Sequence, residues 1–142
     1  MLSYCLLQSI HAMARKPESV FIESIHKHFP SKTSPHREKM NNPYRGGTAD
    51  MWYSGHKGDL WIEYKFLAKI PRVVLPDLTA LQRRWLDSRY DEGRKVWVIV
   101  GCHEGGVVYK SKHWNMPMSA EEFRGRLVDR KQLADSIYRS IS

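Results

Sequence analysis

Apolar positions recur at helical spacing in four segments of the chain. These segments are residues 17–29, residues 78–92, residues 119–127 and a stretch that starts at Asp129. Pro17 suits the first turn of a helix and Pro30 stops one, so both limits of the first segment are marked. Thr79 and Gln82 have the spacing of a capping box, which predicts the start of the second helix. The positions expected to face the core are Phe21, Ile22, Ile25, Phe29, Leu78, Leu81, Trp85, Leu86, Leu133, Ile137 and Ile141.

Five other segments have the pattern of β-strands. They are residues 36–41, 48–53, 59–66, 95–101 and 107–109. The third alternates with a period of two, so its side chains divide between two faces. One face holds Leu60, Ile62, Tyr64 and Phe66, and the other holds Trp61, Glu63 and Lys65. Two glycines in residues 54–58 predict a hairpin loop before this strand. The fourth segment is continuously apolar, which is typical of a strand buried on both faces.

This order of segments predicts an α/β fold, a sandwich with helices on both sides of a mixed sheet. The length of 142 residues suits one domain. We expect this domain to span residues 17–142, with residues 1–16 as an N-terminal extension.

The chain is strongly basic, with 23 Lys and Arg residues against 15 Asp and Glu residues and a formal net charge of +8. This balance favours a partner rich in negative charge, with nucleic acid first and an anionic membrane surface second. Two cysteines far apart in sequence are too few for a disulfide scaffold, which favours the reducing cytoplasm. No apolar run approaches the roughly 20 residues of a membrane span. The histidines and cysteines lack the spacing of a structural zinc site.

Asp50, Glu63 and Lys65 are expected to converge at one end of the sheet. Asp50 starts one strand, while Glu63 and Lys65 share a face of the next strand in the hairpin. Two carboxylates at close range repel each other unless a cation lies between them, and oxygen ligands favour Mg²⁺. Such a site could activate water against a phosphodiester, with Lys65 orienting the water or offsetting charge on the phosphate. The alternative is a solvated strand face with a surface ion pair, but the apolar opposite face and the basic charge favour a site.

The motifs around these residues resemble those of the PD-(D/E)XK nuclease superfamily. They are Gly47-Thr-Ala-Asp50, Asp59-Leu-Trp-Ile-Glu-Tyr-Lys65, Leu78-Thr-x-x-Gln82 with Trp85 and Leu86, and the strand Val96–Val100. The chain looks like the VRR-NUC group, particularly its short phage-encoded members, which are similar to archaeal Holliday junction resolvases. The resemblance covers roughly residues 17–111. One departure is Ala49, which stands where the superfamily name has its proline.

The resemblance implies a restriction-endonuclease-like domain with an αβββαβ core and C-terminal helices. It also implies a phosphodiesterase that requires Mg²⁺ or Mn²⁺. In such an enzyme Asp50 and Glu63 are metal ligands, Lys65 is the catalytic lysine, and Gln82 lies beside that lysine. Compact relatives look dimeric, and a four-way junction needs two symmetric cuts, so we expect a homodimer.

Glu18 and Gln82 each have a second interpretation. The helical wheel places Glu18 on the buried stripe of the first helix, where this family has an acid that faces the metal, often through water. Glu18 could instead only stabilise the helix N-terminus. Gln82 could only close the capping box with Thr79, although a helix that starts beside the site would let it do both. We favour the site for both residues and leave Glu23 on the surface.

Basic and aromatic residues near the motifs are candidates for a DNA-binding surface. The basic candidates are Lys39, Arg45, Lys57, Arg72, Arg83 and Arg84, and the aromatic candidates for stacking on unpaired bases are Tyr44, Trp52 and Trp61. At least half of the basic set could serve solubility alone. Aromatic residues more often serve packing, as we expect for Trp85 and Trp97.

These features together predict a DNA endonuclease that uses Mg²⁺ or Mn²⁺ and favours branched, flapped or junction DNA. One alternative is a catalytically silent DNA-binding module on the same fold. Another is an interaction protein, for example a phage factor that blocks a host enzyme. RNA also remains open as the substrate. The expected compartment is the cytoplasm, or the host cytoplasm if the protein is phage-encoded.

Overall fold

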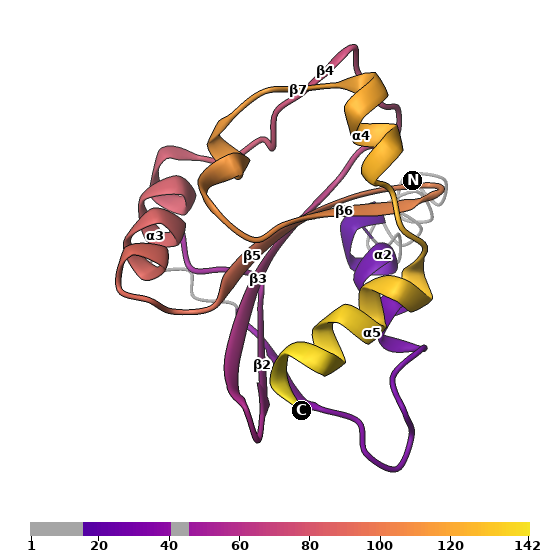
Figure 1. The fold of residues 1–142 in the computed structure, drawn as a ribbon, viewed down its shortest axis with the longest axis vertical. Helices are drawn as coiled ribbons and strands as arrows, with labels where there is room; N and C mark the ends of the chain where they lie inside the picture. Colours follow the sequence, from indigo (N-terminus) through magenta and orange to yellow (C-terminus); the bar gives the residue numbers. More distant parts are fainter. Residues whose placement is uncertain (1–15, 41–45) are drawn as a thin grey trace, which may run out of the picture.

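The computed structural model describes residues 16–40 and 46–142, and Figure 1 shows their arrangement. The helices are α2 (Pro17–His26), α3 (Ala80–Asp91), α4 (Ala120–Arg126) and α5 (Arg130–Ile141), with a short 3-10 helix, η1, at Lys112–Asn115. The strands are β1 (His36–Lys39), β2 (Met51–Gly55), β3 (Gly58–Phe66), β4 (Val73–Val74), β5 (Val96–Cys102), β6 (Gly105–Tyr109) and β7 (Met118–Ser119). The predicted α/β class and the predicted order of the main elements are confirmed.

Five strands form one mixed sheet in the order β1-β2-β3-β5-β6. The first three form an antiparallel meander, and β6 pairs antiparallel with β5. β3 and β5 are parallel, and the crossover between them contains α3. A parallel pair needs such a long connection, because a tight turn joins only antiparallel neighbours. β3 therefore lies at the centre of the sheet, between a hairpin partner and a crossover partner.

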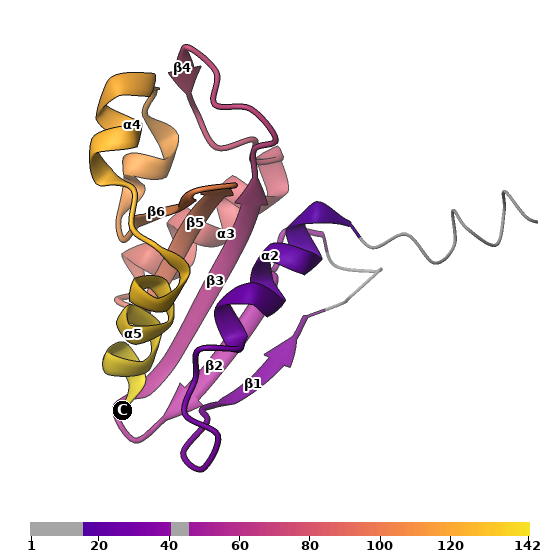
Figure 2. The same ribbon diagram turned by 90° about the vertical axis from the view of Figure 1, so that its right-hand side faces the viewer.

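Helices cover both faces of this sheet, as Figure 2 shows. α2 and α5 pack on one face, against Leu60, Ile62 and Tyr64 of β3. On the other face Leu86 of α3 and Phe123 of α4 pack in a second cluster with the valines of β5. Every residue of β5 is buried, as its continuous apolar run predicts. Among the described residues, no helix is long and apolar enough to cross a membrane.

The limits of two predicted elements need correction. The first helix ends at His26, and residues 27–29 form a turn that still buries Phe29. The residue before a proline disfavours helical geometry, so the helix unwinds before Pro30 rather than at it. The predicted strand 48–53 starts only at Met51 and continues to Gly55.

The second helix starts and ends as predicted, but one of its apolar residues faces outward. Thr79 and Gln82 form the capping box, and Gly93, with φ of +81°, follows the last turn. Leu81 is 54% exposed, contrary to its prediction as a core residue. Gln82 shares one side of the helix with Trp85 and Leu86, so this polar residue takes the inward position beside Leu81.

A second, two-stranded sheet was not predicted. β4 and β7 pair antiparallel, away from the main sheet. Each has only two residues, too few to show a periodic pattern, and the pairing joins segments that are distant in sequence. The 3-10 helix at Lys112–Asn115 was also not predicted.

Candidate active site

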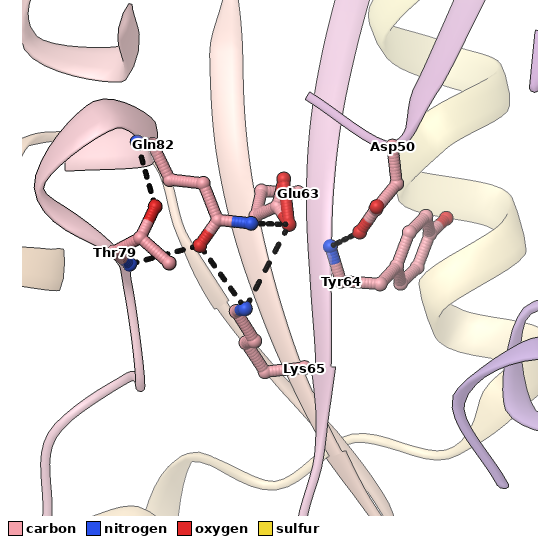
Figure 3. Close-up of polar contacts among 6 residues, drawn as sticks. All are labelled: Asp50, Glu63, Tyr64, Lys65, Thr79 and Gln82. Atoms are coloured by element: carbon pink, nitrogen blue, oxygen red, sulfur yellow. Dashed lines mark hydrogen bonds and ion pairs between the residues drawn. The ribbon is translucent and has the colours of Figure 1, made fainter. Parts of the chain in front are cut away.

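Asp50 lies directly before β2 and is anchored to the strands on both sides. Its backbone carbonyl accepts a hydrogen bond from the Met40 amide (2.8 Å), and its Oδ2 accepts one from the Tyr64 amide of β3 (2.8 Å). Met51 pairs with Ile62, so the antiparallel register places Asp50 beside Glu63. Figure 3 shows the two carboxylates on adjacent strands.

Glu63 is buried at the centre of the sheet, with 1% of its surface exposed. It is the only buried charged residue in the described part of the chain. Its Oε1 accepts a hydrogen bond from the Gln82 side-chain amide (3.2 Å), but its Oε2 has no hydrogen-bond partner among the described residues. A buried carboxylate with an unsatisfied oxygen is costly, because nothing replaces the water it has lost.

The surroundings of Glu63 favour its protonated form. Burial raises the pKa of this carboxyl far above its usual value, and the nearby Asp50 charge raises it further. The Lys65 ammonium opposes this shift and lowers the pKa of Glu63 by a smaller amount. A second positive charge between Asp50 and Glu63 would restore the ionised form.

Lys65 and Gln82 form a polar network with Glu63, drawn in Figure 3. Gln82 Oε1 accepts hydrogen bonds from Lys65 Nζ (3.2 Å) and from the Thr79 backbone amide (3.0 Å). Lys65 Nζ also lies 3.9 Å from Glu63 Oε1. Gln82 therefore closes the capping box and contacts both strand residues, so the two contacts expected of it coexist.

Glu18 faces the same region from α2. It lines a cavity of about 300 Å³ together with Lys16, Lys39 and Asp50. Burial raises the pKa of Glu18, and the negative charge of Asp50 contributes to the rise. Lys16, which sequence analysis did not single out, precedes the helix and opposes the rise, as do Lys39 and Lys65.

A divalent metal ion fits Asp50 and Glu63 rather than a closed cluster. Within residues 16–40 and 46–142, no group of three or more His, Cys, Asp and Glu side chains could hold a metal ion. Glu18 therefore completes no three-carboxylate site of this kind. Mg²⁺ commonly takes only one or two carboxylates and keeps several waters. The unsatisfied Oε2 of Glu63, next to the Asp50 charge, is the feature that such an ion would satisfy.

The basic candidates for DNA contact are spread over several elements. Lys39 of β1 lines the cavity beside Glu18. Arg83 and Arg84 lie on α3, one and two residues after Gln82. Lys57 and Arg72 lie elsewhere, in the β2–β3 turn and before β4. Tyr44 and Arg45, with the expected extension at residues 1–15, lie outside the described residues.

The aromatic candidates contact one another. The rings of Trp52 and Trp61 stack at 26° with centres 6.0 Å apart, and Trp85 meets Trp61 edge-on at 5.6 Å. Trp97 is buried, as expected, whereas Trp85 is only partly buried. The sequence contained one signal for this contact: Trp85 follows Gln82 at i+3, and Trp61 precedes Glu63 on the same strand face.

The sequence matches no protein-family model and no curated protein. Among solved structures, the chain is similar to Hjc of Archaeoglobus fulgidus, a Holliday junction resolvase from an archaeal hyperthermophile. The two chains share 13% identity with a TM-score of 0.47, over 72% of this chain and 91% of that chain. This similarity is too low to carry an activity or a substrate from that protein to this one.

Proposed function

We propose that the protein is a metal-dependent DNA endonuclease of the PD-(D/E)XK type, similar to the VRR-NUC group. The observation that carries this proposal is the Glu63 carboxylate, 1% exposed and with one oxygen unsatisfied, beside Asp50 and in contact with Lys65. An interaction protein or a surface ion pair gives no reason to bury such a charge. A structural role is better served by an apolar residue of similar size.

The residues divide the chemistry among them. Asp50 and Glu63 would hold Mg²⁺ or Mn²⁺, which when bound polarises phosphate oxygens and lowers the pKa of water. Lys65 places its ammonium, 3.9 Å from Glu63, where it can offset negative charge that develops on the phosphate. Gln82 fixes that ammonium through its Oε1 and fixes Glu63 through its amide nitrogen.

The substrate that we propose is branched, flapped or junction DNA. The net charge of +8 supplies affinity for the phosphate backbone without sequence preference. The motif resemblance to short VRR-NUC nucleases favours a structure-selective enzyme, and two symmetric cuts at a four-way junction favour a homodimer.

A cleavage panel tests this function. Purified protein is mixed with single-stranded, duplex, flapped and four-way junction DNA, and with a matched RNA, in Mg²⁺, Mn²⁺ or EDTA. We expect cleavage in either metal, none in EDTA, and a preference for the branched DNA. Binding to DNA without cleavage in any metal would identify the catalytically silent alternative.

Glu18→Gln is expected to raise the Mg²⁺ concentration for half-maximal cleavage by about tenfold, the scale of a residue that supports metal ligands. The reason is that Glu18 adds negative charge beside Asp50 within the same cavity. A Mg²⁺ titration of cleavage measures the effect, and a thermal melt checks that folding is unchanged.

Glu23→Gln is the matched control, because Glu23 lies on the same helix but is exposed. We expect it to change neither measurement. If Glu23→Gln shifted the Mg²⁺ dependence and Glu18→Gln did not, the first-helix acid would have to be reassigned.

A further inference from the structure

A groove of about 710 Å³ lies over the first half of β3, beyond Glu63. It is lined by Lys57, Gly58, Asp59, Trp61, Trp85, Arg89, Glu92, Gly93, Arg94 and Lys95. Four of these residues are basic and two are acidic, so the groove carries net positive charge. Two of them are tryptophans. This combination of cations and aromatic rings differs from the carboxylate chemistry of the candidate active site.

The cations of the groove are only partly neutralised. Arg89 forms an ion pair with Glu92 (2.9 Å) and Lys95 donates to the Ser140 carbonyl. Lys57 and Arg94 are exposed, and neither forms an ion pair with any described residue. Lys57 and Arg94 are therefore free to bind anions.

The tryptophans present partly exposed aromatic surface between these cations. Trp61 and Trp85 meet edge-on at 5.6 Å, and both are only partly buried. The Arg89 guanidinium carbon lies 5.7 Å from the centre of the Trp85 ring, which shows that a flat cation already stacks there. A nucleobase has the same planar shape and offers a π face to indole.

The groove is continuous with the candidate active site through two elements. On β3, Trp61 shares its face with Glu63 and Lys65. On α3, Trp85 and Arg89 follow Gln82 along one side of the helix, over a rise of about 10 Å from Gln82 to Arg89. A strand whose phosphate reaches Lys65 can therefore continue into the groove.

We propose that this groove binds an unpaired strand of the DNA substrate, its bases on Trp61 and Trp85 and its phosphates on Lys57 and Arg94. The proposal rests on the proposed nuclease function and names the part of the substrate that the enzyme recognises. Stacking on indole requires a base with a free face, which an intact duplex does not offer. The groove thus gives a physical reason for selecting flapped or branched DNA.

Binding without cleavage tests the groove directly. A short labelled oligothymidylate is titrated in EDTA and followed by fluorescence anisotropy at several salt concentrations. We expect Trp85→Leu, which keeps apolar bulk but removes the ring, to weaken binding by about tenfold. Lys57→Glu and Arg94→Glu are each expected to weaken binding severalfold and to flatten the logarithmic salt dependence by about 0.7 per lost phosphate contact.

Lys131→Glu is the matched control, because it makes the same change of net charge on α5, which covers the opposite face of the sheet. We expect its affinity to stay within about twofold of the parent, the size of a long-range charge effect under screening. The proposal is overturned if the two groove reversals weaken binding no more than this control. A thermal melt of every variant separates loss of binding from loss of folding.

A cleavage comparison separates this proposal from the nuclease function. If the parent cuts flapped DNA faster than duplex and the groove variants lose only that preference, both proposals hold. If the groove variants keep the preference, the groove proposal fails while the nuclease function stands. If no DNA is cut but oligothymidylate binding depends on Lys57 and Arg94, the groove stands and the nuclease function fails.

Discussion

Lys65→Ala is expected to reduce DNA cleavage by about a hundred- to a thousandfold, the usual cost of removing one group that stabilises transition-state charge. Lys65 is 20% exposed and its ammonium is positioned by Gln82 Oε1 at 3.2 Å. Alanine removes that ammonium but leaves Asp50 and Glu63 in place. Single-turnover cleavage at saturating Mg²⁺, beside a DNA-binding titration, separates the loss of chemistry from the loss of affinity.

Lys69→Ala is the matched control, since Lys69 is exposed a few residues beyond the end of β3. We expect it to keep nearly full activity. Gln82→Ala should fall between the two, because it releases the Lys65 ammonium without removing it. Undiminished cleavage by the Lys65→Ala protein would contradict the mechanism.

The juxtaposition of Asp50 and Glu63 could be predicted because it depends on local rules. A two-residue period fixes which side chains of β3 share a face, and a Gly-rich turn fixes that β2 pairs with β3. These rules together place the residue before β2 beside Glu63. The helical wheel likewise places Glu18 toward the sheet, and it lines a cavity with Asp50.

The position of Leu81 could not be predicted, because two local patterns conflict on α3. Hydrophobicity favours Leu81 in the core, but the helix phase that buries Leu86 turns Gln82 inward instead. The inward phase is stabilised by contacts of Gln82 with Glu63 and Lys65 on β3, which lie 17 and 19 residues earlier in sequence. Only the tertiary structure decides between the two phases.

The tryptophan groove also depends on long-range packing. Its lining comes from the β2–β3 turn, from β3, from α3 and from the segment that leads into β5. Trp85 appeared in the sequence as an ordinary core residue, and Arg89 and Arg94 had no motif around them. The parallel pairing of β3 with β5 brings these segments together, and no short pattern encodes that pairing.

Glu63 links the stability of the fold to its proposed chemistry, with opposite requirements. The folded state raises the pKa of this carboxyl above its unfolded value, so the native protein binds more protons than the unfolded chain between those two values. The free energy of unfolding therefore declines as pH rises through that interval. A metal ion that binds only the folded state would reverse this loss.

Glu63→Gln is expected to abolish cleavage and yet to raise the free energy of unfolding at pH 8 in EDTA by about 1–3 kcal/mol, the scale of an unsatisfied buried polar group. The amide has no charge to bury, and it keeps an oxygen that can accept from Gln82. It also offers an N–H group in place of Oε2, which is unsatisfied among the described residues. Urea denaturation from pH 5 to pH 9 should show the advantage of the variant growing with pH, because only the parent titrates at this position.

Glu121→Gln is the matched control, since Glu121 is exposed on α4 and should leave the pH profile unchanged. Adding Mg²⁺ should stabilise the parent and the control but not Glu63→Gln, so the gap in stability narrows as the metal concentration rises. A variant that was less stable than the parent at pH 8 in EDTA would show that Lys65 and Gln82 alone satisfy the Glu63 carboxylate. In that case the buried charge would need no metal ion, and the strongest support for the proposed chemistry would be lost.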